Sequence, residues 1–202
     1  MAKILLVRHA QTKSHQDDRF WGKTDVTLSD SGVWQAEKLR DRLAEEKITA
    51  VYTSTLSRAR HSAEIIASVH KCRLTTHEEL NEIDFGFIEG LTFEEIKRLH
   101  PELAEVLSGF GTVAEFPGGE SYADLDKRVR TFQRKLTDHQ PKDAVLIVSH
   151  GGSLPLLICH LLGIGAEHWR KIWLELASLS IIHTYPRGTR LSLLNDTSHL
   201  KS

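Results

Sequence analysis

The sequence has few of the features that mark secreted, membrane-spanning or nucleic-acid-binding proteins. Its 202 residues include two cysteines, Cys72 and Cys159, and neither belongs to a CxxC pair, so we expect reduced thiols and no disulfide framework. The N-terminal apolar run, residues 4–7, is too short for a signal peptide, and no run approaches the ~20 apolar residues of a membrane span. A net charge of −1 lacks the basic excess of a general nucleic-acid binder. These absences predict a cytoplasmic protein without a membrane or nucleic-acid partner.

The order of predicted elements indicates an α/β fold. Buried or β-branched runs at residues 3–7, 48–54, 72–77 and 143–150 predict strands, and a closing strand pair is expected at 178–185 and 189–195. Helical spacing of apolar residues predicts helices beginning at Ser29 and Ser57, over 121–137, over 151–163 and over about 167–174. Strands that alternate with helices favour a three-layer α/β/α domain, residues 1–202, around a mostly parallel sheet.

The alternation of predicted strands and helices is interrupted between residues 85 and 120. We interpret this segment as a small helical lid inserted at one end of the sheet. Thr92 and Glu95 have the spacing of a capping box, and a short helix is expected over residues 92–101. Five of the seven phenylalanines lie here, and they are expected to form the core of the lid or, for one or two, to contact an apolar substrate group. They are Phe85, Phe87, Phe93, Phe110 and Phe116.

Polar and cationic side chains follow three of the predicted strands, where open α/β sheets bind ligands. Arg8 and His9 follow the first strand, Arg58 lies shortly after the second, and His150 ends the strand at 143–150. Arginine binds phosphate oxygens through two parallel hydrogen bonds, and Gly151 begins a helix whose free N–H groups favour an anion. This set predicts a phosphoryl site. We find no Walker lysine loop, no acid pair set for magnesium and no HExxH spacing, so no metal or cofactor is expected.

A phosphoryl site of this kind needs a nucleophile and a proton donor. A neutral imidazole can attack phosphorus and form a phosphohistidine, while the flanking cations stabilise the developing charge. Glu82 is the preferred candidate for protonating the leaving group. Four other acids nearby are alternatives: Glu78, Glu79, Asp84 and Glu89.

The chain resembles the histidine phosphatase superfamily, the phosphoglycerate-mutase-like group, from residue 4 to about residue 200. The blocks that carry the resemblance are LVRHAQT, FWGKTDVTLSDSGVWQA, STLSRARHSAE, NEIDFGFIEG and IVSHGG. It implies His9 as nucleophile, Glu82 as proton donor, and Arg8, Arg58 and His150 as the phosphate pocket. It implies further phosphate contacts by Thr12, His15, Gly22 and Gly151. The sequence departs from the family pattern at Ala10, Gln11, His15 and Thr27, and Ala10 would be strained if its φ were positive.

Four functions remain open. Between residues 82 and 126 there are eleven acids and two bases, Lys97 and Arg98, which leaves few cations for a second phosphate and favours a monophosphatase over a phosphoglycerate mutase. ELNEIDFG, PGGESYADLDKRV and LNDTSHL resemble the alpha-ribazole phosphatase members of the family, which act in cobalamin assembly; a broad-specificity sugar or nucleotide phosphatase is the alternative. The non-enzyme alternative is a module that binds a small phosphorylated metabolite. The sequence leaves open whether the protein is a monomer or a dimer.

Overall fold

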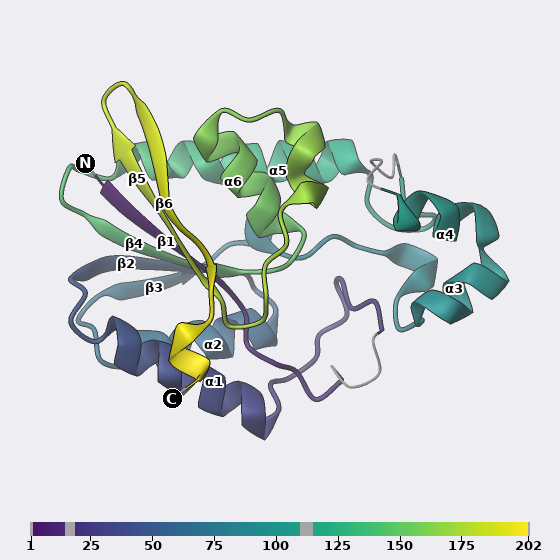
Figure 1. Cartoon of the computed structure of the whole chain (residues 1–202), viewed down its shortest axis with the longest axis horizontal. Coiled ribbons are helices and arrows are strands. Elements are labelled where there is room, and N and C mark those ends of the chain that lie inside the picture. Colours follow the sequence, from purple (N-terminus) through teal and green to yellow (C-terminus); the bar gives the residue numbers. More distant parts are fainter. Residues whose placement is uncertain (1, 15–18, 110–114, 202) are drawn as a thin grey trace.

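A six-stranded sheet forms the centre of the molecule (Figure 1). The structure is a computed structural model, and it describes residues 2–14, 19–109 and 115–201. The strands of the sheet are β1 (Ala2–Arg8), β2 (Ile48–Thr53), β3 (Arg73–Thr76), β4 (Ala144–Ser149), β5 (Leu179–Tyr185) and β6 (Gly188–Asp196). Their order is β3-β2-β4-β1-β5-β6. The pairs among β3, β2, β4 and β1 are parallel, whereas β5 and β6 are antiparallel to their neighbours. The predicted mostly parallel α/β sheet is confirmed.

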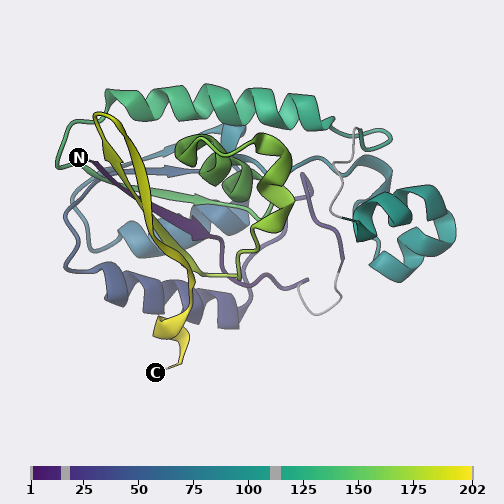
Figure 2. The ribbon, with the colours of Figure 1, turned by 45° about the horizontal axis from the view of Figure 1, so that its top comes forward.

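Helices cover both faces of this sheet (Figure 2). Helices α1 (Asp30–Leu43) and α2 (Ser57–Ala67) pack on one face, and α5 (Tyr122–Lys135) and α6 (Ser153–Leu162) pack on the other. Successive side chains of a strand point to opposite faces, so β1 contributes Ile4 and Leu6 to the α5–α6 core and Leu5 and Val7 to the α1–α2 core. A strand buried on both faces explains the continuous apolar run at the N-terminus.

Side-chain caps fix the helix starts that the sequence predicts. The Ser29 hydroxyl accepts the Gly32 N–H at 3.0 Å at the start of α1. Thr92 and Glu95 form the expected capping box of α3 (Phe93–Leu99). Each cap satisfies N–H groups that have no partner inside the helix, typically contributing about 1 kcal/mol.

Two helical segments differ from the prediction. A further helix, α4 (Pro101–Ser108), follows α3, and Pro101, the last residue of the predicted helix, stands in its first turn. Proline suits that position because its missing N–H would have no partner there. Residues 166–171 form a 3-10 helix, η5 (Ala166–Lys171), in place of the predicted helix over about 167–174. Short 3-10 turns also occur at η2 (Glu78–Leu80), η3 (Gly86–Ile88), η4 (Leu136–Asp138) and η6 (Ser198–Leu200).

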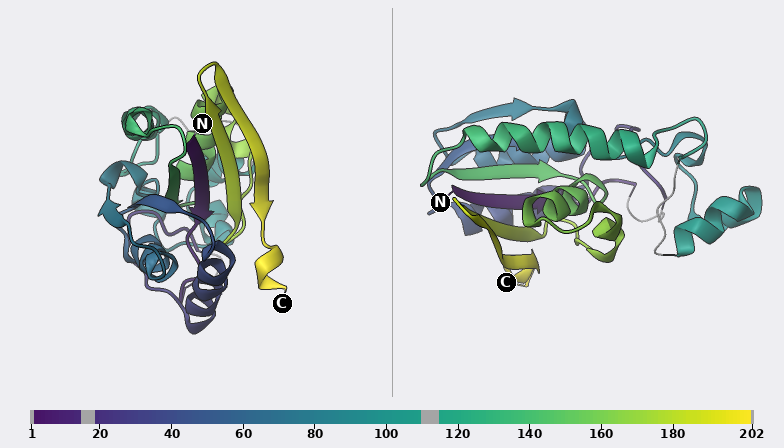
Figure 3. Two further views of the ribbon diagram at one scale, coloured as in Figure 1. Left: turned by 90° about the vertical axis from the view of Figure 1, so that its left-hand side faces the viewer. Right: turned by 90° about the horizontal axis from the view of Figure 1, so that it is seen from above.

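The segment that contains α3 and α4 lies at one end of the molecule, away from the helical layers (Figure 3). Its aromatic side chains do not form a separate core. Phe85 makes edge-to-face contacts with Phe20 and Phe116 at 5.3 and 5.1 Å, within the cluster that continues to α5 and α6. Phe87 is 71% exposed, and Phe110 lies outside the described residues.

Among the residues that the structure describes, no helix combines the length and the apolar character needed to cross a bilayer.

Candidate active site

The carboxyl ends of three adjacent parallel strands bring the predicted site residues together. Strand β4 lies between β1 and β2, and the register pairs Arg8 with Ser149 and Thr53 with Val148. His9, Ser54 and His150 are the next residues along these strands, so they follow at neighbouring positions on one edge of the sheet. The rings of His9 and His150 lie 5.0 Å apart between centroids.

The carbonyl of the following residue, Ala10, holds His9 in one tautomer. His9 is 7% exposed, and its Nδ1 lies 2.8 Å from the Ala10 carbonyl oxygen. A carbonyl only accepts hydrogen bonds, so Nδ1 carries the proton, and in the neutral ring Nε2 holds the lone pair. The His9 N–H also donates to the Ser149 carbonyl at 2.9 Å, which ties this residue to the end of β4.

The backbone at Ala10 is unstrained. Ala10 is absent from the residues with positive φ, it is fully buried, and its N–H donates to the Ser62 hydroxyl at 3.1 Å. The strain that a positive φ would impose on Ala10 is therefore absent.

Arg58 lies at the start of α2 and is 1% exposed. Its guanidinium donates to three carbonyls of the loop before α1: Nη1 to Thr24 at 2.9 Å, and Nη2 to Gly22 at 2.6 Å and Trp21 at 3.2 Å. Burial lowers the pKa of Arg58, although the Glu82 carboxylate opposes this shift. An arginine stays charged under such conditions, so the site contains a buried cation.

Arg8 supplies a second guanidinium. Its Nη1 donates to the Leu174 carbonyl at 2.5 Å, whereas its Nε is buried without a hydrogen-bond partner. The group packs closely on Gly151, where an added Cβ would lie 3.2 Å from the Arg8 Cζ. Burial lowers the pKa of Arg8, and Glu82 and Glu175 oppose the shift. A buried donor without a partner is costly, and an incoming oxyanion would remove that cost.

A hydrogen-bond chain orients His150, which is fully buried. Its Nε2 lies 2.8 Å from the Ser54 hydroxyl oxygen, and that hydroxyl lies 2.9 Å from the Asn81 Oδ1. The Thr55 N–H donates to the same Oδ1, which identifies it as the amide oxygen. The Ser54 hydroxyl must therefore donate to Asn81, and His150 Nε2 must carry the proton that Ser54 accepts.

The other ring nitrogen, Nδ1 of His150, is buried and has no partner. Burial lowers the pKa of His150 well below its ordinary value, and the charge of Arg58 and the ring of His9 add to the shift. His150 is therefore neutral near pH 7, with a lone pair on Nδ1.

The Glu82 carboxylate lies at the start of α6. Both of its oxygens are 3.0 Å from the Gly152 N–H, a favourable place for a negative charge at a helix N-terminus. An added Cβ on Gly152 would lie 2.5 Å from Glu82 Oε1, so glycine is needed for this approach. The Glu82 charge raises the pKa of both Arg8 and Arg58 against the effect of burial.

The other predicted contacts are more scattered. Thr12 is buried and forms an isolated β-bridge with Leu28, and Gly151 lies against Arg8. The Gly22 N–H donates to the Glu89 carboxylate at 3.1 and 3.2 Å. His15 lies outside the described residues.

The sequence did not predict Asn81 as a site residue, nor that Ser54 orients His150. Asn81 directly precedes the predicted proton donor, and Ser54 directly follows β2, so their positions were visible. The contact of Ser54 with His150, 96 positions away, and that of Asn81 with Ser54, 27 positions away, were not visible in the sequence.

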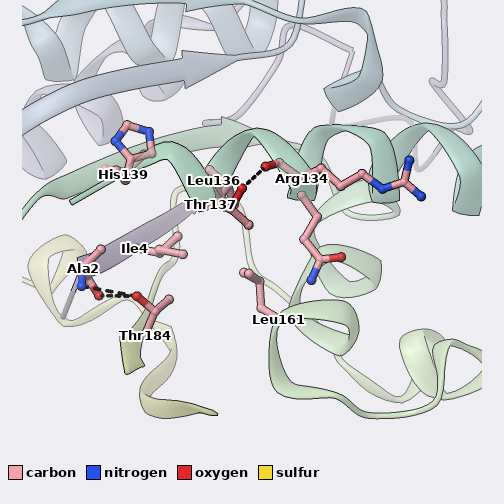
Figure 4. A pocket seen from close by; sticks show the side chains of 10 residues that line it. Ala2, Ile4, Arg134, Leu136, Thr137, His139, Leu161 and Thr184 are labelled. Carbon is pink, nitrogen blue, oxygen red and sulfur yellow. Dashed lines mark hydrogen bonds between the residues drawn. The ribbon is translucent and has the colours of Figure 1, made fainter. Parts of the chain in front are cut away.

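A separate cavity of about 370 Å³ lies at the opposite end of the sheet, under α5 (Figure 4). It is lined at the amino ends of β1 and β4 by Ile4 and Val145, together with Leu136 and Leu161. This apolar cavity is distinct from the histidine and arginine cluster.

Comparison with known proteins agrees with this geometry. The chain belongs to the histidine phosphatase superfamily, because a profile of branch 1 of that superfamily matches residues 4–197. Members of the superfamily are phosphatases or mutases that act on small phosphorylated substrates.

Three individual proteins illustrate the range of similarity. Phosphoserine phosphatase 1 of Hydrogenobacter thermophilus is 32% identical over 200 residues, which cover 99% of this chain and 95% of that protein. Phosphoglycerate mutase-like protein 4 of Arabidopsis thaliana is 35% identical over 154 residues, covering 75% of this chain and 67% of that protein. The crystal structure of the alpha-ribazole phosphatase from Shigella flexneri superposes with a TM-score of 0.88 at 28% identity and covers 96% of each chain.

Proposed function

We propose that this protein is a metal-independent phosphomonoester hydrolase that works through a phosphohistidine on His9. The observation that carries the proposal is the Nδ1 contact of His9 with the Ala10 carbonyl, since it leaves Nε2 as the nucleophilic nitrogen. Arg8, Arg58 and protonated His150 would hold the three phosphoryl oxygens and stabilise the transition-state charge. We also propose that residues 1–202 act as one domain, with an insertion at about residues 85–120.

In the first step, Nε2 of His9 forms a bond to phosphorus as the bond from phosphorus to the leaving-group oxygen breaks. Glu82, in its protonated form, gives its proton to that oxygen, so the alcohol leaves neutral. His9 keeps its Nδ1 proton throughout, and the Ala10 carbonyl stabilises the positive charge that the phosphorylated ring acquires.

In the second step, water attacks phosphorus and the bond from phosphorus to Nε2 breaks. The Glu82 carboxylate takes the water proton, which restores the acid, the neutral imidazole and free phosphate. The site supplies its positive charge through side chains, which is the reason for proposing metal independence. Turnover of p-nitrophenyl phosphate that persists in EDTA would support this, and activity that returns only with added metal would contradict it.

The substrate is proposed to be a small monoester that carries one phosphate. Alpha-ribazole phosphate is the first candidate, from the likeness to the Shigella flexneri structure. Phosphoserine is the second, from the 32% identity to phosphoserine phosphatase 1. Among the described phenylalanines of the insertion, Phe85, Phe93 and Phe116 pack against or within the core and Phe87 is exposed, so Phe87 is the candidate for contact with a flat substrate group.

Relative kcat/KM values on a panel of monoesters test the substrate. The panel contains alpha-ribazole phosphate, phosphoserine, nucleotides, sugar phosphates and phosphoglycerates. A preference of at least about tenfold, equal to 1.4 kcal/mol, for one of the first two supports that assignment. Equal rates indicate a broad-specificity phosphatase. Transfer of phosphate between the hydroxyls of phosphoglycerate without release would indicate a mutase, and binding without turnover would indicate a phospho-ligand-binding module.

A further inference from the structure

The Glu89 carboxylate is bound by four backbone N–H groups. Three come from consecutive residues of the loop before α1, namely Gly22 at 3.1 Å, Lys23 at 3.0 Å and Thr24 at 3.2 Å. The fourth comes from Phe85 at 3.1 Å. Glu89 directly follows η3, so a residue of the insertion holds a loop that belongs to the main body.

The carbonyls of the same loop hold Arg58. The peptide unit between Trp21 and Gly22 donates its N–H to Glu89 and accepts Arg58 Nη2 at its oxygen, 3.2 Å away. The next unit donates the Lys23 N–H to Glu89 and accepts Arg58 Nη2 at the Gly22 oxygen, 2.6 Å away. Two peptide groups therefore stand between a carboxylate and a guanidinium, each bonded at both ends.

The direction of these peptide dipoles favours both charges. A peptide group is positive at its N–H and negative at its carbonyl, with a dipole of about 3.5 D. The carboxylate lies at the positive end and the guanidinium at the negative end, so each charge polarises the bonds that the other one uses. The Glu89 charge also raises the pKa of Arg58 against the effect of burial.

Glycine at position 22 is required for this arrangement. An added Cβ would lie 1.9 Å from the Ile83 carbonyl oxygen and 2.4 Å from Glu89 Oε1. The first of these atoms belongs to the backbone and cannot move aside cheaply, so the loop approaches Glu89 only without a side chain.

We infer that Glu89 is a positioning residue for Arg58, acting through the backbone of residues 21–24. Glu89 fixes the loop, and the loop carbonyls fix the plane of the guanidinium. The guanidinium has five N–H donors, so its bonds to the loop leave donors for a phosphoryl oxygen. Glu89 touches neither the phosphoryl group nor the reacting atoms. The inference rests on the proposed function in one respect, which is that Arg58 binds the phosphoryl group.

A double-mutant cycle on oxyanion binding tests this inference. The variants are Glu89→Gln, Arg58→Met and the double substitution, and the probe is inorganic vanadate, whose dissociation constant is measured by calorimetry. Glu89→Gln alone is expected to weaken binding about tenfold, within the range of coupling energies between neighbouring groups. In the Arg58→Met background the same change is expected to alter binding by less than about twofold. Glu94→Gln, an exposed acid of α3, is the control and is expected to leave binding unchanged.

Two outcomes would overturn the inference: no loss of vanadate affinity in Glu89→Gln, or the same loss with and without Arg58. Thermal unfolding of each variant identifies any that fail to fold. Glu89→Asp keeps the charge on a shorter side chain and is the second variant, with a smaller loss that again disappears without Arg58. A wild-type protein that binds vanadate but hydrolyses no monoester would refute the proposed function alone. A wild-type protein that binds no vanadate would refute both.

Discussion

The Nε2 atom of His150 lies 2.8 Å from the Oγ atom of Ser54, and the Ser54 hydroxyl is committed to Asn81. The proton of neutral His150 is therefore on Nε2, and Nδ1 must gain a proton before it can donate to an oxyanion. Burial and the Arg58 charge lower the pKa of His150, and the negative charge of a bound anion would raise it. Anion binding and protonation of His150 are thus linked.

This linkage predicts proton uptake on sulfate binding. Sulfate stays a dianion between pH 6 and 8, so its own titration does not contribute. We expect about one proton taken up per sulfate and an affinity that rises as pH falls through this range. Calorimetry in buffers of different ionisation enthalpy measures the uptake. His150→Gln should abolish it, and uptake that persists in this variant would assign the proton to another group, such as His9.

Glu82→Gln should affect substrates according to their leaving groups. A glutamine cannot donate the proton, so an alkyl phosphate should lose about 10²–10⁴-fold in kcat/KM, which reports the first step, and this is the usual contribution of general acid catalysis. p-Nitrophenyl phosphate should lose much less, because nitrophenolate leaves without protonation. Steady-state kinetics on both esters check this difference. Glu78→Gln, an exposed acid close by in the chain, is the control that should leave both rates unchanged. Equal losses on the two esters would remove Glu82 from the role of acid.

Gly152→Ala should impair turnover as well as stability. The new methyl group would lie 2.5 Å from Glu82 Oε1 and would displace the carboxylate from the start of α6. We expect kcat to fall about tenfold or more, with a loss of stability of about 1–3 kcal/mol from overpacking. Gly165→Ala is a matched control because its Cβ would lie 2.3 Å from a Glu167 oxygen, but Glu167 is exposed and can rotate away. Equal effects of the two substitutions on kcat would contradict the placement of Glu82.

Stability should decrease below pH 6.5. Burial is the largest cause that lowers the pKa of five histidines, namely His70, His77, His150, His160 and His199. Between each folded-state pKa and the unfolded value of about 6.5, the unfolded chain holds more protons, so unfolding becomes easier as pH falls. Each such histidine contributes a slope of up to about 1.4 kcal/mol per pH unit.

Urea unfolding between pH 7.5 and 5 measures that slope. His150→Gln should reduce it, whereas His61→Gln, at an exposed position, should not. A free energy of unfolding that stays constant down to pH 5 would show that these rings titrate normally in the folded protein.

Local patterns were enough to predict the layers of the fold. All six residues of β4 are buried, and a continuous apolar run indicates such a strand directly. The Ser29 cap and the Thr92–Glu95 capping box involve residues three positions apart, so spacing reveals them. Helix α4 was missed because its proline was interpreted as the end of a helix, although proline serves equally well at a start.

The sequence predicted which residues form the site, but not the hydrogen bonds that orient them. Parallel strands place Arg8, His9 and His150 at one edge, and the topology alone implies that they meet. The bonds that orient them join distant segments: Ser54 to His150, and Glu89 to the loop at residues 22–24. Such contacts depend on how the segments pack, and no local spacing encodes them.

The phosphorylation of His9 is the central claim, and trapping the intermediate tests it most directly. Brief incubation with ³²P-labelled p-nitrophenyl phosphate, acid-free quenching and peptide mass spectrometry should locate one phosphate on His9, stable in base and labile in acid. Glu82→Gln should accumulate it, because the second step also needs this carboxyl group, and His9→Ala should show none. Label on another residue, or turnover by His9→Ala within tenfold of the wild-type rate, would contradict the mechanism.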